Sequence, residues 1–153
     1  MHEDYDSWTV SNDIAILVLE GNADFSSSKI GSIRLPSEGE EYPAGTMCTV
    51  SGWGTLSEAG SLSEVLMKVT VPVVSDDKCR EAYGQDEIFD SSLCAGFDQG
   101  GKDHCQGDSG GALMCGSQLS GVVSWGYGCA QPGFPGVYAQ TSYYISWLNS
   151  HMK

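Results

Sequence analysis

A serine held among glycines, with an acid directly before it, is the part of this sequence best suited to chemistry. Ser109 lies in the run KDHCQGDSGG, residues 102–111. Glycine has no Cβ, so it permits positive φ and a close approach of the backbone to a ligand. The N–H groups of Gly107 and Ser109 could therefore share one oxygen and stabilise negative charge as it develops there. The Ser109 hydroxyl would be the attacking atom, and it needs a neighbouring base to take its proton.

Three other interpretations of this run remain open. The segment fits the G-x-S-x-G elbow of α/β-hydrolases, but that elbow needs a helix after the serine and a later acid and histidine. Here Ser109 is followed by the short apolar run 112–115, and the only later histidine is His151. A glycine-rich turn without chemistry is the plain alternative, because Gly, Asp and Ser are common turn residues. A nucleotide-binding loop fits poorly, because no Gly-Lys-Ser/Thr follows.

The chain around this serine is rich in short strand-like segments separated by turn residues. Strand candidates are residues 14–19, 46–53, 64–71, 91–97, 112–115, 119–125 and 136–141. Residues 75–84 predict a short helix, because Ser75 suits an N-cap and Gly84 a stop. Residues 142–150 predict a C-terminal helix, and residues 25–45 a linker and loop. Repeated short strands with glycine-rich turns predict an all-β barrel or sandwich.

Size and charge narrow the function classes. The 153 residues suffice for one domain with a real core. The net charge of −13 argues against nucleic acid and anionic membranes as partners, since both need Lys/Arg patches. It is compatible with cationic substrates, and equally with an acidic surface that only aids solubility. No apolar run approaches the ~20 residues of a transmembrane helix.

The cysteines point to an oxidising compartment. Their even number, six, suits a disulfide framework, although sequence alone allows about 15 pairings. No C-x-x-C or H-x-x-x-H spacing indicates zinc, so we expect neither a metal nor a cofactor. Met1 is followed by acidic residues, without the basic and apolar regions of a signal peptide. A disulfide-rich chain without an export signal is contradictory, and we expect its N-terminal part to be missing.

Several further motifs occur in the order found in chymotrypsin-like serine proteases. They are NDIAIL at 12–17, VSGWG at 50–54, SWG at 124–126 and PGVY at 135–138, together with GDSGG at 107–111. The chain resembles this family over essentially its whole length and is most similar to arthropod digestive trypsins, but only to their later part. The resemblance implies an all-β, chymotrypsin-like Greek-key barrel with a short C-terminal helix. Residues 36–153 would be the complete C-terminal barrel, and residues 1–35 the remnant of a largely missing N-terminal barrel and its linker.

The resemblance assigns the reaction to four residues. Ser109 is the nucleophile, and Asp13 is the acid that orients the catalytic histidine, although Asp13 also suits a plain turn. The N–H groups of Gly107 and Ser109 form the oxyanion hole. Asp108 matches the acid that pairs with a free N-terminal amine after zymogen cleavage and so sets that geometry.

The resemblance also implies a pocket for basic side chains. Asp103 is the carboxylate at its base, where an arginine or lysine would form a charge-assisted hydrogen bond. Gly126 and Gly136 are wall positions that leave room for a long cation. The segment that pairs with the substrate backbone as an added strand consists of Ser124, Trp125 and Gly126. His104 stands where a small residue is usual, which leaves the preference between arginine and lysine open.

The resemblance selects three disulfides and reveals one missing part. The pairs are Cys48–Cys115, Cys79–Cys94 and Cys105–Cys129. The family's Thr-Ala-Ala-His-Cys-like motif, which supplies the catalytic histidine, is absent from this sequence. His2 matches a surface position and His151 lies in the terminal tail, so neither is expected to be the base.

The implied function is that of a secreted, extracellular trypsin-like serine endopeptidase. It would cleave polypeptides after arginine or lysine through an acyl-enzyme at Ser109, and protein protease inhibitors would be partners. This chain alone, without the histidine, is expected to be inactive. The alternative is a non-catalytic protease homologue that binds cationic peptides or a protein partner.

Overall fold

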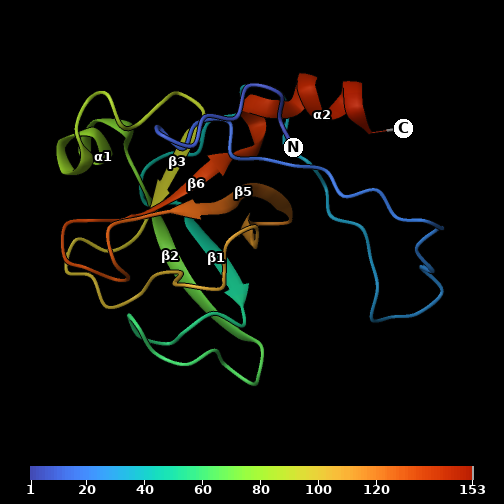
Figure 1. Ribbon diagram of the computed structural model, residues 1–153, viewed down its shortest axis with the longest axis horizontal. Helices are drawn as coiled ribbons and strands as arrows, with labels where there is room; N and C mark the ends of the chain where they lie inside the picture. Colours follow the sequence, from blue (N-terminus) through green and yellow to red (C-terminus); the bar gives the residue numbers. More distant parts are fainter. Residues whose placement is uncertain (153) are drawn as a thin grey trace.

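Six short strands close into an antiparallel barrel in the computed structural model, which describes residues 1–152 (Figure 1). The strands are β1 (Met47–Gly52), β2 (Met67–Val74), β3 (Ser92–Ala95), β4 (Ala112–Cys115), β5 (Gln118–Trp125) and β6 (Gly136–Gln140). Their order around the barrel is β1-β2-β3-β6-β5-β4, and β4 pairs back to β1. Closure leaves no free sheet edge. The all-β barrel expected from the sequence is confirmed.

The barrel interior is filled by side chains that alternate along the strands. Successive side chains of a strand point to opposite faces, so one set from each strand faces inward. The fully buried set includes Val71, Leu113 and Tyr138, from β2, β4 and β6. Together with Val50 and Val123 they form one continuous apolar cluster that holds β5 and the neighbouring strands in register.

Two helical segments lie outside the barrel. Helix α1 (Asp76–Tyr83) begins where the Ser75 Oγ accepts a hydrogen bond from the Lys78 N–H, and ends at Gly84, whose φ is 110°. Both ends are as the sequence predicts. The C-terminal helix expected over 142–150 is confirmed, but it starts as the 3₁₀ turn η1 (Thr141–Tyr144) before α2 (Ile145–His151). Its buried face, with Tyr144 and Leu148, packs on Ile14.

The expected strand at residues 14–19 is not formed. Ile14 is buried, but Leu17 and Val18 are 90% and 87% exposed, and Figure 1 shows this segment leading into a long excursion away from the barrel. An apolar run becomes a strand only when another strand pairs with it, and no described segment of the chain does so. The apolar composition of residues 14–19 therefore predicted a buried strand, but no strand within residues 1–152 pairs with this segment.

Strand β2 is displaced from its expected bounds of 64–71. It runs through Pro72, because residues 67–72 pair with β1 whereas Val73 and Val74 pair with β3. A proline has no N–H to donate and is tolerated where a ladder changes or ends. Here it stands at the change of partner, and its carbonyl still accepts a hydrogen bond from the Gly96 N–H at 2.9 Å.

Three disulfides fasten the barrel and its loops. The bonded pairs are Cys48–Cys115, Cys79–Cys94 and Cys105–Cys129, the pairs that the family resemblance implies. The first joins β1 to β4 at the closure of the barrel, and the second joins α1 to β3. Each such bridge contributes about 2–4 kcal/mol to the stability of a typical domain. Within residues 1–152 no helix is long and apolar enough to cross a membrane.

Candidate active site

Strand β5 holds the aspartate near the N-terminus. The Ser124 Oγ, close to the end of β5, donates a hydrogen bond of 2.7 Å to the Asp13 Oδ2. The two residues are 111 positions apart in the sequence. Ile14 next to Asp13 is buried against α2 and β6, which fixes the backbone on which the carboxylate stands. A carboxylate held in this way can orient an imidazole that approaches its free oxygen.

The serine turn is attached to the same end of β5. Ser109 is exposed and lies between Gly107 and Gly110, whose φ angles are 93° and 79°. The Gly110 N–H donates to the carbonyl of Val123 at 2.9 Å, one residue before Ser124. The Ser109 turn and Asp13, which are expected to take part in one reaction, are thus hydrogen-bonded to consecutive residues of β5. Positive φ at both glycines explains why residues with a side chain are not favoured there.

Asp108 is half-buried and points away from the serine into the protein. Its Oδ1 accepts from the Gly54 N–H at 2.8 Å, and its Oδ2 accepts from the Cys105 N–H at 3.0 Å. A Cβ on Gly54 would lie 2.5 Å from the Asp108 Cγ, so the carboxylate requires a glycine there. Both oxygens are therefore held by main-chain donors, and this anchors the Ser109 turn on the loop after β1.

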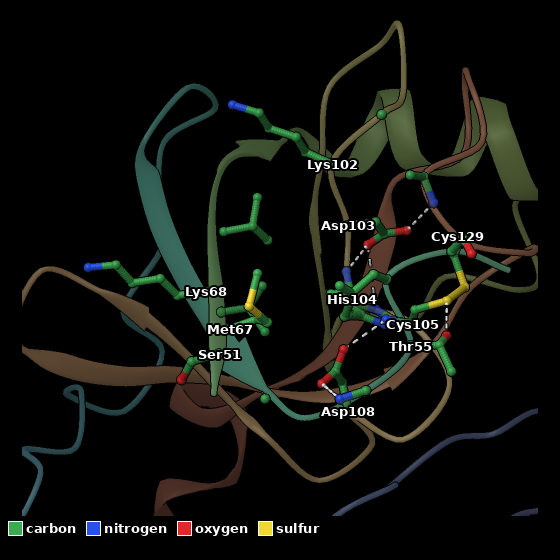
Figure 2. Close-up of a pocket in the computed structure, with 18 residues that line it drawn as sticks. Ser51, Thr55, Met67, Lys68, Lys102, Asp103, His104, Cys105, Asp108 and Cys129 are labelled. Carbon is green, nitrogen blue, oxygen red and sulfur yellow. Dashed lines mark hydrogen bonds and ion pairs between the residues drawn. A yellow bond between two sulfur atoms is a disulfide. The ribbon is translucent and has the colours of Figure 1, made fainter. Parts of the chain in front are cut away.

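A cavity of about 230 Å³ opens beside Asp108 (Figure 2). Its lining includes apolar side chains from β1 and β2, such as Val50 and Val69, and the carboxylates of Asp103 and Asp108. Gly126 and Gly136, the expected walls of the basic pocket, are not in this lining. The cavity therefore lies on the side of Asp103 that faces Asp108, and not between Gly126 and Gly136.

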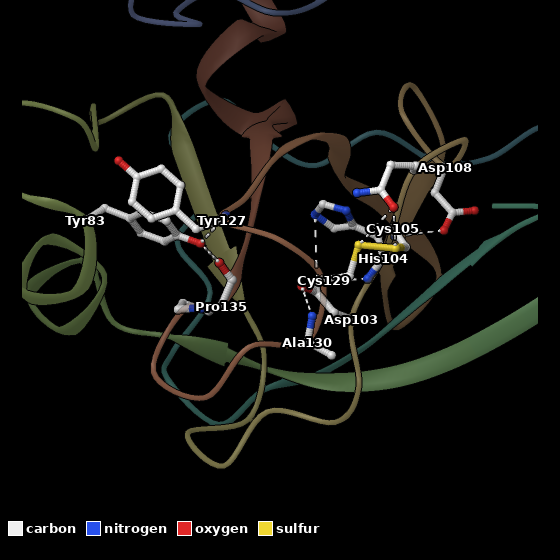
Figure 3. A network of polar contacts seen from close by, with 10 residues as sticks. Tyr83, Asp103, His104, Cys105, Asp108, Tyr127, Cys129, Ala130 and Pro135 are labelled. Carbon is white, nitrogen blue, oxygen red and sulfur yellow. Dashed lines mark hydrogen bonds and ion pairs between the residues drawn. A yellow bond between two sulfur atoms is a disulfide. The ribbon is translucent and has the colours of Figure 1, made fainter. Parts of the chain in front are cut away.

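Asp103 and His104 are buried together. The Asp103 Oδ1 accepts from the His104 N–H at 2.8 Å, and its Oδ2 accepts from the Ala130 N–H at 3.0 Å (Figure 3). Their side chains are only 6% and 8% exposed. Burial raises the pKa of the Asp103 carboxyl and lowers the pKa of the His104 imidazole, because removal from water disfavours the charged form of each.

The two expected wall glycines face each other beside this pair. A Cβ on Gly126 would lie 4.0 Å from the Gly136 Cα. A Cβ on Gly136 would collide with the Asp103 carboxylate and would lie 2.7 Å from the His104 Nε2. The space that Gly136 leaves is therefore taken up by these two side chains. The Cys105–Cys129 disulfide ties their loop to the segment after Gly126.

Sequence reasoning missed Tyr83, which supports the Gly126 segment from α1. Its hydroxyl donates to the Pro135 carbonyl at 2.6 Å, and its ring packs edge-on against Trp125 with centroids 4.9 Å apart. Burial raises the pKa of Tyr83 to about 12, so the phenol remains a neutral donor near neutral pH. Nothing local in the helix sequence marks this role, because it depends on contacts 52 residues away.

The three histidines lie away from the serine. His2 stacks on Trp147 with ring centroids 4.8 Å apart, and His151 contacts the same ring at 4.7 Å. His104 is buried beside Asp103. Within residues 1–152 no hydrogen bond joins a histidine to Ser109 or Asp13. The described chain thus holds the expected nucleophile and acid without a base between them. Residues 1–152 contain no group of three or more potential ligands arranged for a metal ion.

A closed six-stranded antiparallel barrel, with a disulfide-anchored serine turn at the end of β5, defines a chymotrypsin-like domain. Comparison with known proteins agrees: the family model "Trypsin" matches residues 1–148, and the chain belongs to the trypsin family of serine proteases.

Known relatives show how much of such a protein the chain represents. It is 49% identical to Trypsin-1 of Astacus astacus over 99% of this chain and 64% of that protein. It is 47% identical to Trypsin eta of Drosophila melanogaster over 96% of this chain and 56% of that protein. For Serine protease 1 of Rattus norvegicus the identity is 45%, over 96% and 58%. The chain therefore spans less than two thirds of the length of each of these relatives.

Proposed function

We propose that this chain is part of a secreted trypsin-like endopeptidase that cleaves polypeptides after arginine or lysine. It is the part that carries the nucleophile and binds the substrate. The observation that carries the proposal is the burial of the Asp103 carboxylate next to Gly136, six residues before Ser109 and on a loop fastened by the Cys105–Cys129 disulfide. A buried carboxylate attracts a basic side chain and positions the following peptide bond. The three disulfides support an extracellular location.

The reaction would be acyl transfer. The Ser109 Oγ attacks the carbonyl carbon while its proton passes to a histidine that Asp13 orients, and the N–H groups of Gly107 and Ser109 stabilise the oxyanion. The carbon–nitrogen bond then breaks as the histidine returns the proton to the amine. Water hydrolyses the acyl ester and regenerates Ser109. The histidine would belong to a segment upstream of Met1, so the chain alone is expected to be inactive.

We assign residues 1–35 to an N-terminal barrel and its linker, and residues 36–153 to the C-terminal barrel. The exposed apolar side chains of Leu17 and Val18 support this division, because they have no cover within the described chain. The cavity beside Asp108 supports the pairing of its carboxylate with a free N-terminal amine, since apolar walls would strengthen that ion pair. Protein protease inhibitors that present a basic side chain would bind at the same site.

Cleavage specificity tests this function. The chain is extended at its N-terminus with the sequence encoded upstream of Met1, activated, and incubated with an unbiased peptide library. We expect cleavage after arginine and lysine only, because Asp103 selects for a cation. Mass spectrometry of the products is the readout. Cleavage after aromatic or small residues, or an upstream sequence without a histidine motif, would contradict the proposal.

A non-catalytic homologue is the second candidate. Within residues 1–152 no histidine is hydrogen-bonded to Ser109, and this favours the second candidate. In that case the extended protein would bind cationic peptides without cleaving them.

A further inference from the structure

The Nε2 atom of the His104 imidazole has no hydrogen-bond partner within residues 1–152, although it is buried beside a carboxylate. Its Nε2 is 3.9 Å from the Asp103 Oδ1 and makes no hydrogen bond within the described chain. A buried polar nitrogen without a partner costs free energy, so such a group calls for an explanation. A shift of about 1 Å would bring Nε2 within hydrogen-bond reach of the carboxylate, at about 2.9 Å.

The His104 ring also occupies the position that a substrate cation needs. The space above Gly136, which lacks a side chain, is filled by Nε2 and by the Asp103 Oδ1. A protonated imidazole is itself a cation with two donors. Protonated His104 and a bound arginine or lysine would therefore require the same carboxylate oxygen and the same space.

We propose that His104 is a specificity-determining residue that acts as an internal competitor for the cation site, so that acidification closes the site to basic side chains. The inference rests on the proposed function, because it assumes that Asp103 is the carboxylate that binds the substrate. One proton bound by the Asp103–His104 pair makes the pair neutral, whichever atom carries it. Cation binding must expel that proton. Each pH unit below the midpoint of proton uptake by the pair therefore weakens cation binding about tenfold.

The other ionisable groups around the imidazole do not replace it in this role. Tyr138 of β6 contacts the ring edge-on with centroids 5.0 Å apart, and burial raises the pKa of its phenol well above the ordinary value, so it stays neutral. Asp108 faces the pair from the same loop, but both its oxygens accept main-chain hydrogen bonds. Lys68 of β2 and Lys102 line the adjoining cavity, and Figure 2 shows both side chains directed away from the pair.

Tyr83 of α1 is a further ionisable group, and its phenol is influenced by the charge of Asp103. Its hydroxyl is engaged with Pro135 and stays neutral, as its raised pKa requires. Burial raises the pKa of Asp103 and lowers the pKa of His104, so the two pKa values move toward each other. The two groups therefore titrate as one pair that exchanges its first proton in a single step.

The test is the binding of benzamidinium, a compact aromatic cation, to this chain as a function of pH. Titration calorimetry from pH 4.5 to 8.5 gives Kd for the unaltered chain and for His104→Asn, which keeps a polar side chain but cannot titrate. Neutral benzamide is the ligand control, and His104→Gln is a second variant in case the first does not fold. Circular dichroism verifies folding at each pH.

We expect both forms to bind benzamidinium at pH 8.5, and the unaltered chain to lose affinity steeply below the midpoint of the titration of its Asp103–His104 pair. In the acid range the unaltered chain should lose at least about tenfold more affinity for benzamidinium than His104→Asn, because the variant has one titrating group fewer beside the cation site. Superimposable pH profiles would overturn the inference and leave the proposed function standing. Binding no tighter than that of benzamide in every form at pH 8.5 would overturn both.

Discussion

Replacing Ser109 by alanine in the N-terminally extended, activated protein is expected to lower kcat/KM for an arginine peptide amide by about a millionfold. The reason is that Ser109 is exposed, lies in a turn bounded by two positive-φ glycines, and is fixed to β5 by the Gly110 hydrogen bond to Val123. Alanine removes the attacking oxygen but preserves these backbone contacts. Loss of the nucleophile should therefore change the rate of chemistry and not the fold.

Steady-state hydrolysis of a chromogenic arginine amide measures this effect, and the thermal unfolding midpoint of both forms shows whether the fold is retained. Ser117→Ala is the matched control, because Ser117 is an exposed serine in the turn between β4 and β5. That variant should keep full activity. Residual turnover within tenfold of the unaltered protein in Ser109→Ala would show that another group carries the reaction.

Replacing Asp103 by asparagine is expected to weaken benzamidinium binding at pH 8.5 by about tenfold to a hundredfold. This range corresponds to the loss of one hydrogen bond to a charged group, about 1.5–3 kcal/mol. The substitution keeps a side-chain oxygen that can accept from the Ala130 N–H, and it removes the charge and the oxygen that accepts from the His104 N–H. Calorimetry with this chain provides the measurement, with neutral benzamide as the ligand that should be unaffected.

Asp98→Asn is the control for nonspecific electrostatics. Asp98 is an acid of a nearby loop whose side chain is 81% exposed and forms an ion pair with the exposed Lys78. The net charge of −13 becomes −12 in either variant, so a general field effect would weaken binding equally in both. Equal effects of the two substitutions would contradict the role assigned to Asp103.

Local signals in the sequence were sufficient where neighbouring residues decide the structure. Strand β4 has the bounds predicted for residues 112–115, and α1 begins and ends at the predicted Ser75 and Gly84. The strand predicted over residues 14–19 does not form, and the bounds predicted for β2 were wrong. In both cases the pairing with other strands decides the structure. The first lacks a partner within the described chain, and the second changes partner at Pro72.

The candidate active site shows the same difference between local sequence signals and long-range contacts. The types of Asp13, Asp103 and Ser109 identified them as candidates, and the structure adds the contacts that hold them. The support of Asp13 by Ser124 spans 111 residues, and that of Asp108 by Gly54 spans 54. The complete burial of His104 was also beyond the sequence, because it depends on the space at Gly136 and on the ring of Tyr138. Only folding reveals that a loop histidine lies in the expected cation site.

The central claim is that Asp103 and Ser109 belong to one site, and affinity labelling tests it most directly. All six cysteines are in disulfides, so Ser109→Cys introduces the only free thiol of this chain. This thiol needs no histidine to react, since about a tenth or more of it is thiolate at pH 8. The Ser109→Cys chain is treated with a bromoacetamide that carries a benzamidinium group, or with the neutral benzamide analogue of this reagent.

Mass spectrometry gives the two labelling rates at residue 109. We expect at least about tenfold faster labelling by the cationic reagent, since binding at Asp103 raises the local concentration of the electrophile. The additional substitution Asp103→Asn should bring the ratio of the two rates close to one. A ratio near one before that substitution, or a ratio that survives it, would contradict the claim that the acid and the serine form a single site.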